Sequence, residues 1–157
     1  MSHTRLAPQD VSPHAAALLQ LQHAAYAVEA ALIQDDRIPA LQETVDDLLA
    51  AQLHWVVDAQ DGTIVGAIGY VANNGVIEID RLIVDPGRHR QGIGRRLVMQ
   101  VLEDGRSAIV STGRDNGPAR RLYEKAGFTH LADREVIPGL VVSDYALAAT
   151  TGGALTG

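Results

Sequence analysis

Apolar residues recur along this chain with helical spacing in some segments and with strand spacing in others. The helical spacing is clearest in the second half of the chain. One apolar helical face follows Gly92 and consists of Ile93, Leu97, Val98, Val101 and Leu102. A shorter stripe precedes Gly127 and consists of Ala119, Leu122, Tyr123 and Ala126. Apolar residues three and four positions apart share one side of a helix. The pattern therefore predicts two amphipathic helices, the second of which ends at Gly127.

Two more helices are predicted nearer the N-terminus. Residues 12–33 are rich in alanine and leucine, and Ser12 followed by Pro13 suits a helix start. A proline-containing break then separates this helix from the next one. The second helix is predicted over residues 43–53, with Thr44 near its beginning.

Extended segments rich in valine and isoleucine make up much of the remaining chain. Strands are predicted over residues 4–6, 54–59, 63–72, 76–84, 107–112, 128–136 and 140–148. Asp-Gly at residues 61–62 and Asn-Gly at residues 74–75 are strong turn signals. The order of elements predicts an α/β (α+β) fold, in which a mixed, mostly antiparallel central sheet has helices on both faces.

Composition narrows the class of protein. A chain of 157 residues with 46% hydrophobic and 20% charged residues is expected to form a single domain over residues 1–149, with a mobile tail at residues 150–157. The lack of cysteine excludes disulfides and thiolate chemistry, and the spacing of the six histidines predicts no metal site. No apolar run is as long as a membrane span and the N-terminus lacks a signal-peptide core, so we expect a soluble, cytoplasmic protein.

Positive charge gathers at one place in a chain whose formal net charge is -6. Four arginines and a histidine surround a Gly-x-Gly sequence within residues 84–98, between a predicted strand and a predicted helix. A helix N-terminus carries partial positive charge, so Arg95 and Arg96 are unfavourable there unless an anion binds. Gly92 and Gly94 allow a ligand to approach the backbone closely. The loop therefore predicts a phosphate or pyrophosphate site.

Other functions of this loop fit the sequence less well. A dinucleotide-binding fingerprint needs a third small residue where this chain has Leu97, and a Walker loop needs a Gly-Lys-Ser/Thr sequence that is absent. Binding to nucleic acid is not expected of an acidic domain with 4% aromatic residues and no basic face. An ordinary solvated loop remains the alternative for this segment taken alone.

A second motif follows farther along the chain. The pattern N-x-x-A-x-x-x-Y-x-x-x-G-F is matched by Asn116, Ala119, Tyr123, Gly127 and Phe128. The pattern V-x-P-x-x-R/Q-x-x-G-x-G/A-x-x-L is matched by Val84, Pro86, Gly92, Gly94 and Leu97. With both motifs in this order, the chain resembles the GCN5-related N-acetyltransferase (GNAT) family from about residue 5 to residue 148. His89 departs from the family pattern, which has arginine or glutamine there.

The resemblance implies that acetyl-CoA, or another acyl-CoA, is the donor. The backbone of residues 91–95 would hold the pyrophosphate, and the edge of residues 82–84 would pair with the pantetheine amides as an added strand does. The arginines would balance the phosphates. The implied donor-binding residues are Leu82, Ile83, Val84, His89, Arg90, Gln91, Gly92, Ile93, Gly94, Arg95, Asn116 and Tyr123.

Without cysteine, direct attack of the amine on the thioester in a ternary complex is the simplest route. The family pattern makes Tyr123 the candidate general acid for the departing sulfur. Glu78 and Asp80 are candidate bases, because strict alternation along residues 76–84 would set both carboxylates on one face with Leu82 and Val84. Both carboxylates could instead form structural ion pairs, and His54 is a further candidate base. The resemblance also implies that the backbone N–H of Val84, near a strand bulge, stabilises the oxyanion.

The acceptor is inferred from charge. Residues 1–60 carry eight acidic and two basic residues, and in the resembled family this region forms the acceptor wall. An acidic wall suits an amine, so a small-molecule amine is the expected acceptor. Two alternatives remain open: a non-catalytic acyl-CoA-binding regulatory module, and an acetyltransferase that modifies protein or peptide amines. Only the resemblance supports a homodimer.

Overall fold

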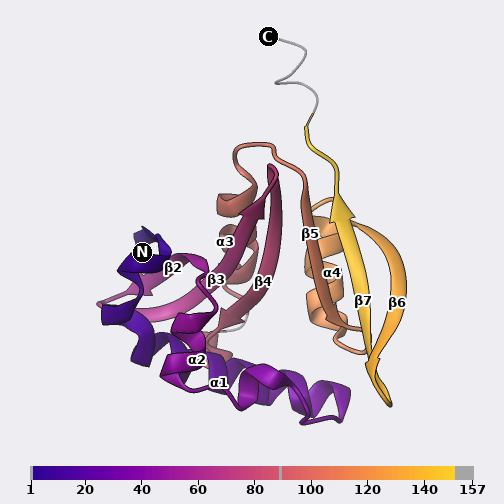
Figure 1. Cartoon of the computed structure of the whole chain (residues 1–157), viewed down its shortest axis with the longest axis horizontal. Helices are drawn as coiled ribbons and strands as arrows, with labels where there is room; N and C mark the ends of the chain where they lie inside the picture. The colour runs from indigo at the N-terminus through magenta and orange to yellow at the C-terminus, as the bar shows by residue number, and fades with distance from the viewer. Residues whose placement is uncertain (1, 89, 151–157) are drawn as a thin grey trace.

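A seven-stranded sheet forms the centre of the computed structural model, which describes residues 2–88 and 90–150. The order of the strands across the sheet is β1-β2-β3-β4-β5-β7-β6 (Figure 1). Among the strand pairs of the described residues, only that of β4 with β5 is parallel. The strands are β1 (Ser2–Leu6), β2 (His54–Gln60), β3 (Thr63–Asn73), β4 (Val76–Val84), β5 (Ala108–Gly113), β6 (Thr129–Ile137) and β7 (Leu140–Leu147). The predicted mixed, mostly antiparallel sheet is confirmed.

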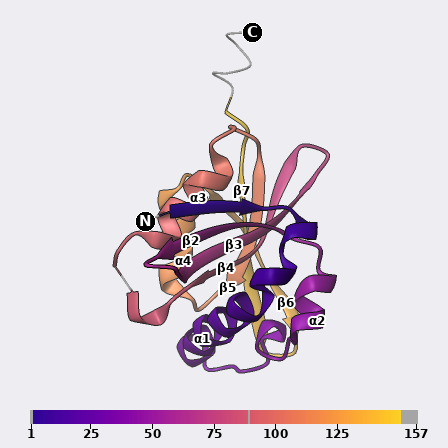
Figure 2. The same ribbon diagram turned by 90° about the vertical axis from the view of Figure 1, so that its left-hand side faces the viewer.

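Helices cover both faces of this sheet (Figure 2), as predicted. Helices α1 (Ala15–Ile33) and α2 (Val45–Ala50) pack on one face, and α3 (Ile93–Leu102) and α4 (Gly117–Lys125) on the other. One-turn 3₁₀ helices lie at Pro8–Asp10, Ser12–His14, Pro39–Leu41 and Pro86–Arg88. Residues 151–157, which make up most of the predicted tail, lie outside the described residues.

Local sequence signals explain where the helices begin and end. Thr44 caps α2 in a capping box with Asp47, whose backbone N–H lies 3.2 Å from the threonine hydroxyl. The helix ends earlier than predicted, and Gln52 then adopts a left-handed conformation. Asn116 caps α4, and Gly127 follows that helix with a φ of 102°. Few residues other than glycine adopt this φ without strain, so Gly127 turns the chain into β6.

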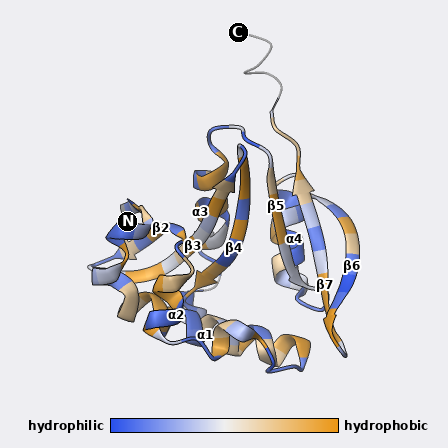
Figure 3. Cartoon of the chain, in the orientation of Figure 1, coloured by the Kyte–Doolittle hydropathy of each residue, from blue (hydrophilic) through white to orange (hydrophobic). Residues whose placement is uncertain are grey.

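Two hydrophobic cores lie on opposite faces of the sheet. The core beneath α3 and α4 contains Ile77 and Ile79 of β4, whereas the core beneath α1 and α2 contains Ile83 of the same strand. The central strands carry long hydrophobic stretches (Figure 3), as expected of strands that are covered on both sides. Strand β4 therefore belongs to both cores, and its side chains change sides along its length.

That change of sides is caused by a β-bulge at Asp80. Gly69 of β3 pairs with Arg81, but the next residue, Tyr70, pairs with Ile79, so Asp80 is the extra residue of β4. The prediction that Glu78 and Asp80 share a face with Leu82 and Val84 is therefore wrong. Strict alternation along the strand assumed a regular ladder, and one inserted residue reverses the faces that follow it.

Strands β4 and β5 separate soon after they meet. Their parallel pairing covers only Ile77–Ile79 of β4 and Ala108–Val110 of β5. Beyond the bulge, β4 stays paired with β3 while β5 continues alongside β7. The β5-facing edge of residues 80–84 thus has no strand partner among the described residues, and Figure 1 shows β4 and β5 diverging. This divergence leaves room for a ligand at the centre of the sheet.

Candidate active site

The loop between β4 and α3 leads directly into the N-terminus of α3. Gly92 has a φ of 71° and precedes Ile93, where α3 begins without a side-chain cap. A Cβ atom on Gly94 would lie 3.1 Å from the side chain of Leu122, so glycine at this position lets the start of α3 pack closely against α4. The first turn of a helix of this length offers unpaired donors and partial positive charge. The residues fit an anionic group such as a pyrophosphate.

The loop arginines divide into structural and outward-facing groups. Nη1 of Arg96 donates to the carbonyl of Gln91 at 2.7 Å, and Nη2 lies 3.8 Å from the buried carboxylate of Asp58. Arg88 donates to the side chain of Gln60 at 2.6 Å. Arg90 and Arg95 are exposed. The first two arginines tie the loop to β2, and the last two remain accessible to a ligand.

A hollow, here called the donor groove, runs from this loop toward α4. Most of the predicted donor-binding residues line it: Leu82, Val84, Arg90, Gly92, Ile93, Gly94, Arg95 and Asn116. Ile83 does not, because it faces the core beneath α1. Gln91 is absent from the lining although its carbonyl holds Arg96, and His89 lies outside the described residues. Val84 pairs with Gly66, and the nearest bulge of this strand is at Asp80.

A second hollow, here called the inner pocket, continues between the diverging strands. Tyr123 lies on its wall, 4% exposed and in edge contact with Phe128. Burial raises the pKa of Tyr123 well above its usual range, so its phenol keeps its proton at neutral pH. The residues that line both the donor groove and the inner pocket are Tyr26, Glu29, Leu82, Asn116 and Ala119. The two hollows therefore meet beside α4.

The two predicted bases lie in different surroundings. Asp80 lines the inner pocket, but Glu78 lines a neighbouring hollow together with Ile109 and Leu131. The Glu78 carboxylate accepts a hydrogen bond from Asn73. His54 stacks on Tyr70, with ring centroids 5.6 Å apart. Of these three candidates, only Asp80 is in the same hollow as Tyr123.

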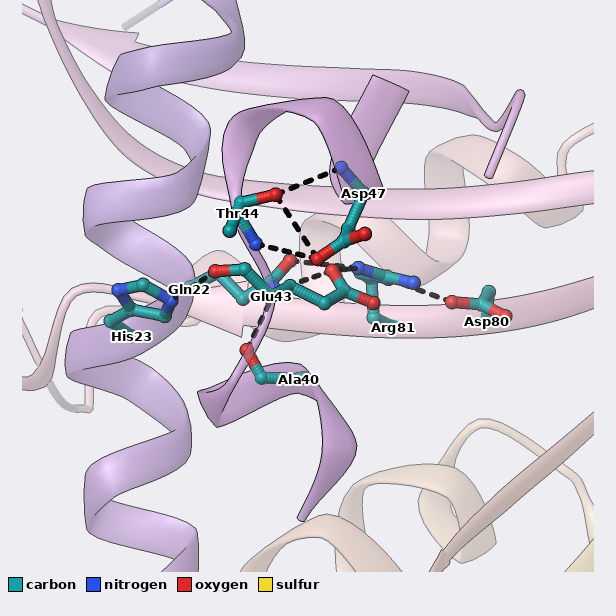
Figure 4. Close-up of polar contacts among 8 residues, drawn as sticks. All are labelled: Gln22, His23, Ala40, Glu43, Thr44, Asp47, Asp80 and Arg81. Carbon is teal, nitrogen blue, oxygen red and sulfur yellow. Dashed lines mark hydrogen bonds and ion pairs between the residues drawn. The ribbon is translucent and has the colours of Figure 1, made fainter. Parts of the chain in front are cut away.

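Asp80 belongs to a polar network around the buried Arg81 (Figure 4). Nε of Arg81 donates to Asp80 at 2.7 Å, and Nη1 donates to Glu43 at 2.6 Å and to Gln22 at 2.9 Å. Regular alternation along β4 would point Arg81 away from Asp80, but the bulge lets these two successive side chains meet. The network joins β4 to α1 and to the segment before α2, and it holds Asp80 in an ion pair.

Sequence reasoning missed one acidic residue of the site. Glu29 of α1 lines both hollows, and its Oε1 accepts a hydrogen bond of 2.6 Å from Nδ2 of Asn116. Burial raises the pKa of the Glu29 carboxyl above its usual value, and the bond from Asn116 partly offsets this increase. Its only sequence signal is a lone charge within the alanine-rich stretch of residues 24–32, which does not show what the helix faces.

Comparison with known proteins identifies the family. Residues 16–128 match the profile described as the Acetyltransferase (GNAT) family, which is more than half of the chain. The chain therefore belongs to this family, and the predicted resemblance is confirmed. None of the helices within residues 2–88 and 90–150 combines the length and the hydrophobicity that a bilayer span requires.

Two curated relatives are similar in sequence. UPF0157 protein YqkA of Bacillus subtilis is 37% identical over 133 residues, which cover 83% of this chain and 39% of the relative. N-alpha-acetyltransferase RimI of Mycobacterium tuberculosis is 32% identical over 95 residues, which cover 56% of this chain and 60% of the relative. The chain thus spans about two fifths and three fifths of these proteins.

Solved structures share the fold. A GNAT-family protein from Desulfovibrio desulfuricans is 28% identical with a TM-score of 0.66, over 95% of this chain and 99% of that one. The PaiA N-acetyltransferase from Thermoplasma acidophilum, solved in complex with coenzyme A, is 16% identical with a TM-score of 0.71, over 96% and 100% of the two chains.

Across the described residues, no group of three or more histidine or acidic side chains is arranged to hold a metal ion.

Replacing Arg81 with methionine should destabilise the fold. Arg81 is 8% exposed, and its loss would leave Glu43 and Gln22 without their donor. Removing one partner of a buried ion pair costs about 3–5 kcal/mol. Because Glu43 is partly in contact with water, the loss in the free energy of unfolding should lie near the lower end of this range. Urea denaturation measures this loss. Arg134→Met is the control, since it removes an exposed pair with Asp144 and should change stability little; equal losses would contradict the assignment.

Proposed function

We propose that this protein transfers an acetyl group from acetyl-CoA to a primary amine by direct attack in a ternary complex. The observation that carries the proposal is the meeting of the donor groove with the inner pocket beside Tyr123. One hollow begins at an anion-binding helix terminus, and the other offers carboxylates and a buried phenol. Membership of the acetyltransferase family supports the same conclusion.

The donor is held mainly by backbone groups and by the accessible arginines. The N–H groups at the start of α3 would bind the pyrophosphate, and Arg90 and Arg95 would neutralise its charge. The unpaired edge of residues 82–84 offers backbone partners for the pantetheine amides. When bound, acetyl-CoA supplies an activated thioester. The coenzyme A complex of PaiA supports this assignment through a shared fold.

Tyr123 is proposed to protonate the departing sulfur. The phenol lies in the inner pocket near the junction of the two hollows. Because burial raises its pKa, the residue keeps the proton until a strongly basic thiolate forms beside it. Asn116 caps α4, the helix that carries Tyr123, and so helps to fix its position.

A protein or peptide N-terminus is the second candidate acceptor. The observation in its favour is the similarity to the relative named N-alpha-acetyltransferase RimI. The hollow that contains Glu78 also shares Asp80, Val110 and Ser111 with the inner pocket, which would allow a longer acceptor to extend over the open sheet face. A small amine remains the primary proposal, because it fits in the inner pocket without using the neighbouring hollow that contains Glu78.

A screen of amines with acetyl-CoA, followed by the release of free thiol, tests the proposed function. Small alkylamines, diamines and short peptides should be compared at the same concentration. Turnover of small amines is the expected result, and preference for peptides would favour the second candidate. Acetyl-CoA binding without turnover of any amine would instead indicate a non-catalytic regulatory module.

Gly92→Val should abolish binding of acetyl-CoA. Gly92 lines the donor groove with a φ of 71°, so a branched side chain there would strain the loop and fill part of the groove. Calorimetry should show no binding, and acetyl-CoA should no longer raise the melting temperature of the variant. Gly75→Val is the matched control because Gly75 has a φ of 80° in the turn between β3 and β4, at the other end of β4 from this loop, so it introduces similar backbone strain without affecting binding. Normal binding by the Gly92 variant would refute the assignment of the loop.

Tyr123→Phe should reduce turnover and leave donor affinity almost unchanged. Phenylalanine retains the ring contacts but has no proton to donate. Loss of one general acid should lower kcat by about 10- to 1000-fold. Steady-state kinetics and calorimetric titration with acetyl-CoA provide the two measurements. Pre-steady-state kinetics measure the rate of the chemical step before product release. An unchanged rate of that step in the variant would argue against this role.

A further inference from the structure

We propose that Glu29 binds the ammonium group of the acceptor and removes its proton, and that the acceptor carries an apolar substituent beside that group. This inference rests on the acetyl transfer proposed above. It assigns the base to α1, whereas the sequence pointed to β4. It also defines the substrate class more narrowly than a primary amine of any kind.

The position of Glu29 is the first argument. It is the only acidic residue among those that line both the donor groove and the inner pocket. An amine in the inner pocket must approach the donor where the two hollows meet. A general base must lie within hydrogen-bonding reach of the proton that it removes. Glu29 satisfies this requirement from the wall, on the side formed by α1.

The hydrogen bonding of Glu29 is the second argument. Oε1 accepts from Asn116, whose own Oδ1 accepts from the backbone N–H of Ala119 at 3.2 Å. The amide is thus fixed at the start of α4 and orients the carboxylate in turn. No other group in the described part of the chain hydrogen-bonds Glu29, so Oε2 is available for an ammonium donor.

The charges around Glu29 are the third argument. The titratable groups that share the inner pocket with it are Tyr26 from its own helix, Asp80 and Arg81 from β4, and Tyr123 from α4. Burial raises the pKa of both tyrosines, which stay neutral. Arg81 is compensated by Asp80 and Glu43. The loop arginines line the other end of the donor groove, where the phosphates would bind. A cation is therefore favoured beside Glu29.

The other two candidate bases are less suitable. Glu78 lines a different hollow and accepts a hydrogen bond from Asn73. Asp80 accepts from Arg81, so one of its carboxylate oxygens is already occupied by the guanidinium. Glu29 pairs with no cationic side chain among residues 2–88 and 90–150, and burial raises its pKa above that of an ordinary glutamate.

These groups and the solvent account for every proton that moves in the transfer. The acceptor ammonium gives one proton to Glu29, and the free amine then attacks the thioester carbonyl. A C–N bond forms and the C–S bond breaks. The nitrogen loses a second proton to solvent as the amide forms, while Tyr123 protonates the sulfur and regains one proton from solvent. The products are the N-acetylated amine, CoA thiol and one proton released when Glu29 ionises again.

The rest of the inner pocket defines the substituent on the amine. Beyond the polar junction, the wall is formed largely by aliphatic side chains from α1, from the segment that follows it, and from β6 and β7: Ile33, Ile38, Val136, Leu140 and Val142. Apolar surface of this kind favours an alkyl or aryl group over a second charge. We therefore expect a monoamine such as hexylamine to be acetylated more efficiently than a diamine of similar length.

Paired acceptors that differ in charge test the base. Hexylamine is a cation near neutral pH, whereas O-pentylhydroxylamine has a similar shape, is uncharged and needs no deprotonation before attack. Glu29→Gln should lower kcat/KM for hexylamine by at least about 100-fold, the usual contribution of a general base. The loss with O-pentylhydroxylamine should be less than about 10-fold. The rise in kcat/KM with pH that reflects the ionisation of Glu29 should also disappear from the profile for hexylamine.

Controls separate this inference from its alternatives. Glutamine retains an oxygen that accepts from Asn116, so the variant should fold, which a melting curve checks. Glu78→Gln is the rival variant and should affect neither acceptor. Equal losses with both acceptors in Glu29→Gln would reduce Glu29 to a structural role, and a selective loss in Glu78→Gln would return the base to β4.

A binding measurement keeps the inference distinct from the proposed function. Hexylamine should bind the CoA-saturated wild-type protein in calorimetry and should not bind the Glu29→Gln variant. If the wild-type protein binds CoA but acetylates no amine, the proposed function fails, whereas a Glu29-dependent amine site would still be detected. Equal binding of hexylamine by both proteins would overturn the assignment of Glu29.

Discussion

The separation of β4 from β5 is the structural constraint on which the candidate site depends. Three residues of parallel pairing hold the two halves of the sheet together, and beyond Ile79 each strand follows a different neighbour. The backbone edge of β4 is left without a strand partner at the point where the donor groove and the inner pocket meet. A continuous sheet would have filled this region with side chains. The same divergence supplies both the binding edge and the space above it.

The bulge at Asp80 determines which groups reach this space. It carries Arg81 to the face covered by α1, where Glu43 and Gln22 bind the guanidinium, and it turns Leu82 toward the donor groove. A buried arginine is tolerated because Asp80, Glu43 and Gln22 accept its hydrogen bonds and two of them balance its charge. The network consequently fixes the segment between α1 and α2 against the sheet, and that segment forms part of the pocket wall.

Much of the fold and half of the site could be predicted because the signals are local. Gly92, Gly94 and Asn116 act through backbone conformation, close approach and capping, which short motifs record directly. The bulge could not be predicted, since Val76–Val84 alternates regularly in sequence and one extra residue is visible only in its pairing with β3. Glu29 was missed for a related reason. Its role depends on where the C-terminal half of α1 lies relative to α4, which no local pattern specifies.

The two hollows are built from separate parts of the chain, and this separation has an evolutionary consequence. Apart from Ala25, Tyr26 and Glu29, the donor groove is formed by residues 82–122, whereas much of the opposing pocket wall comes from α1 and the irregular segment that follows it. Substitutions at Ile33 or Ile38 would reshape the acceptor side without altering the glycine loop. Acceptor preference can therefore diverge among descendants of one ancestral domain while the donor remains the same.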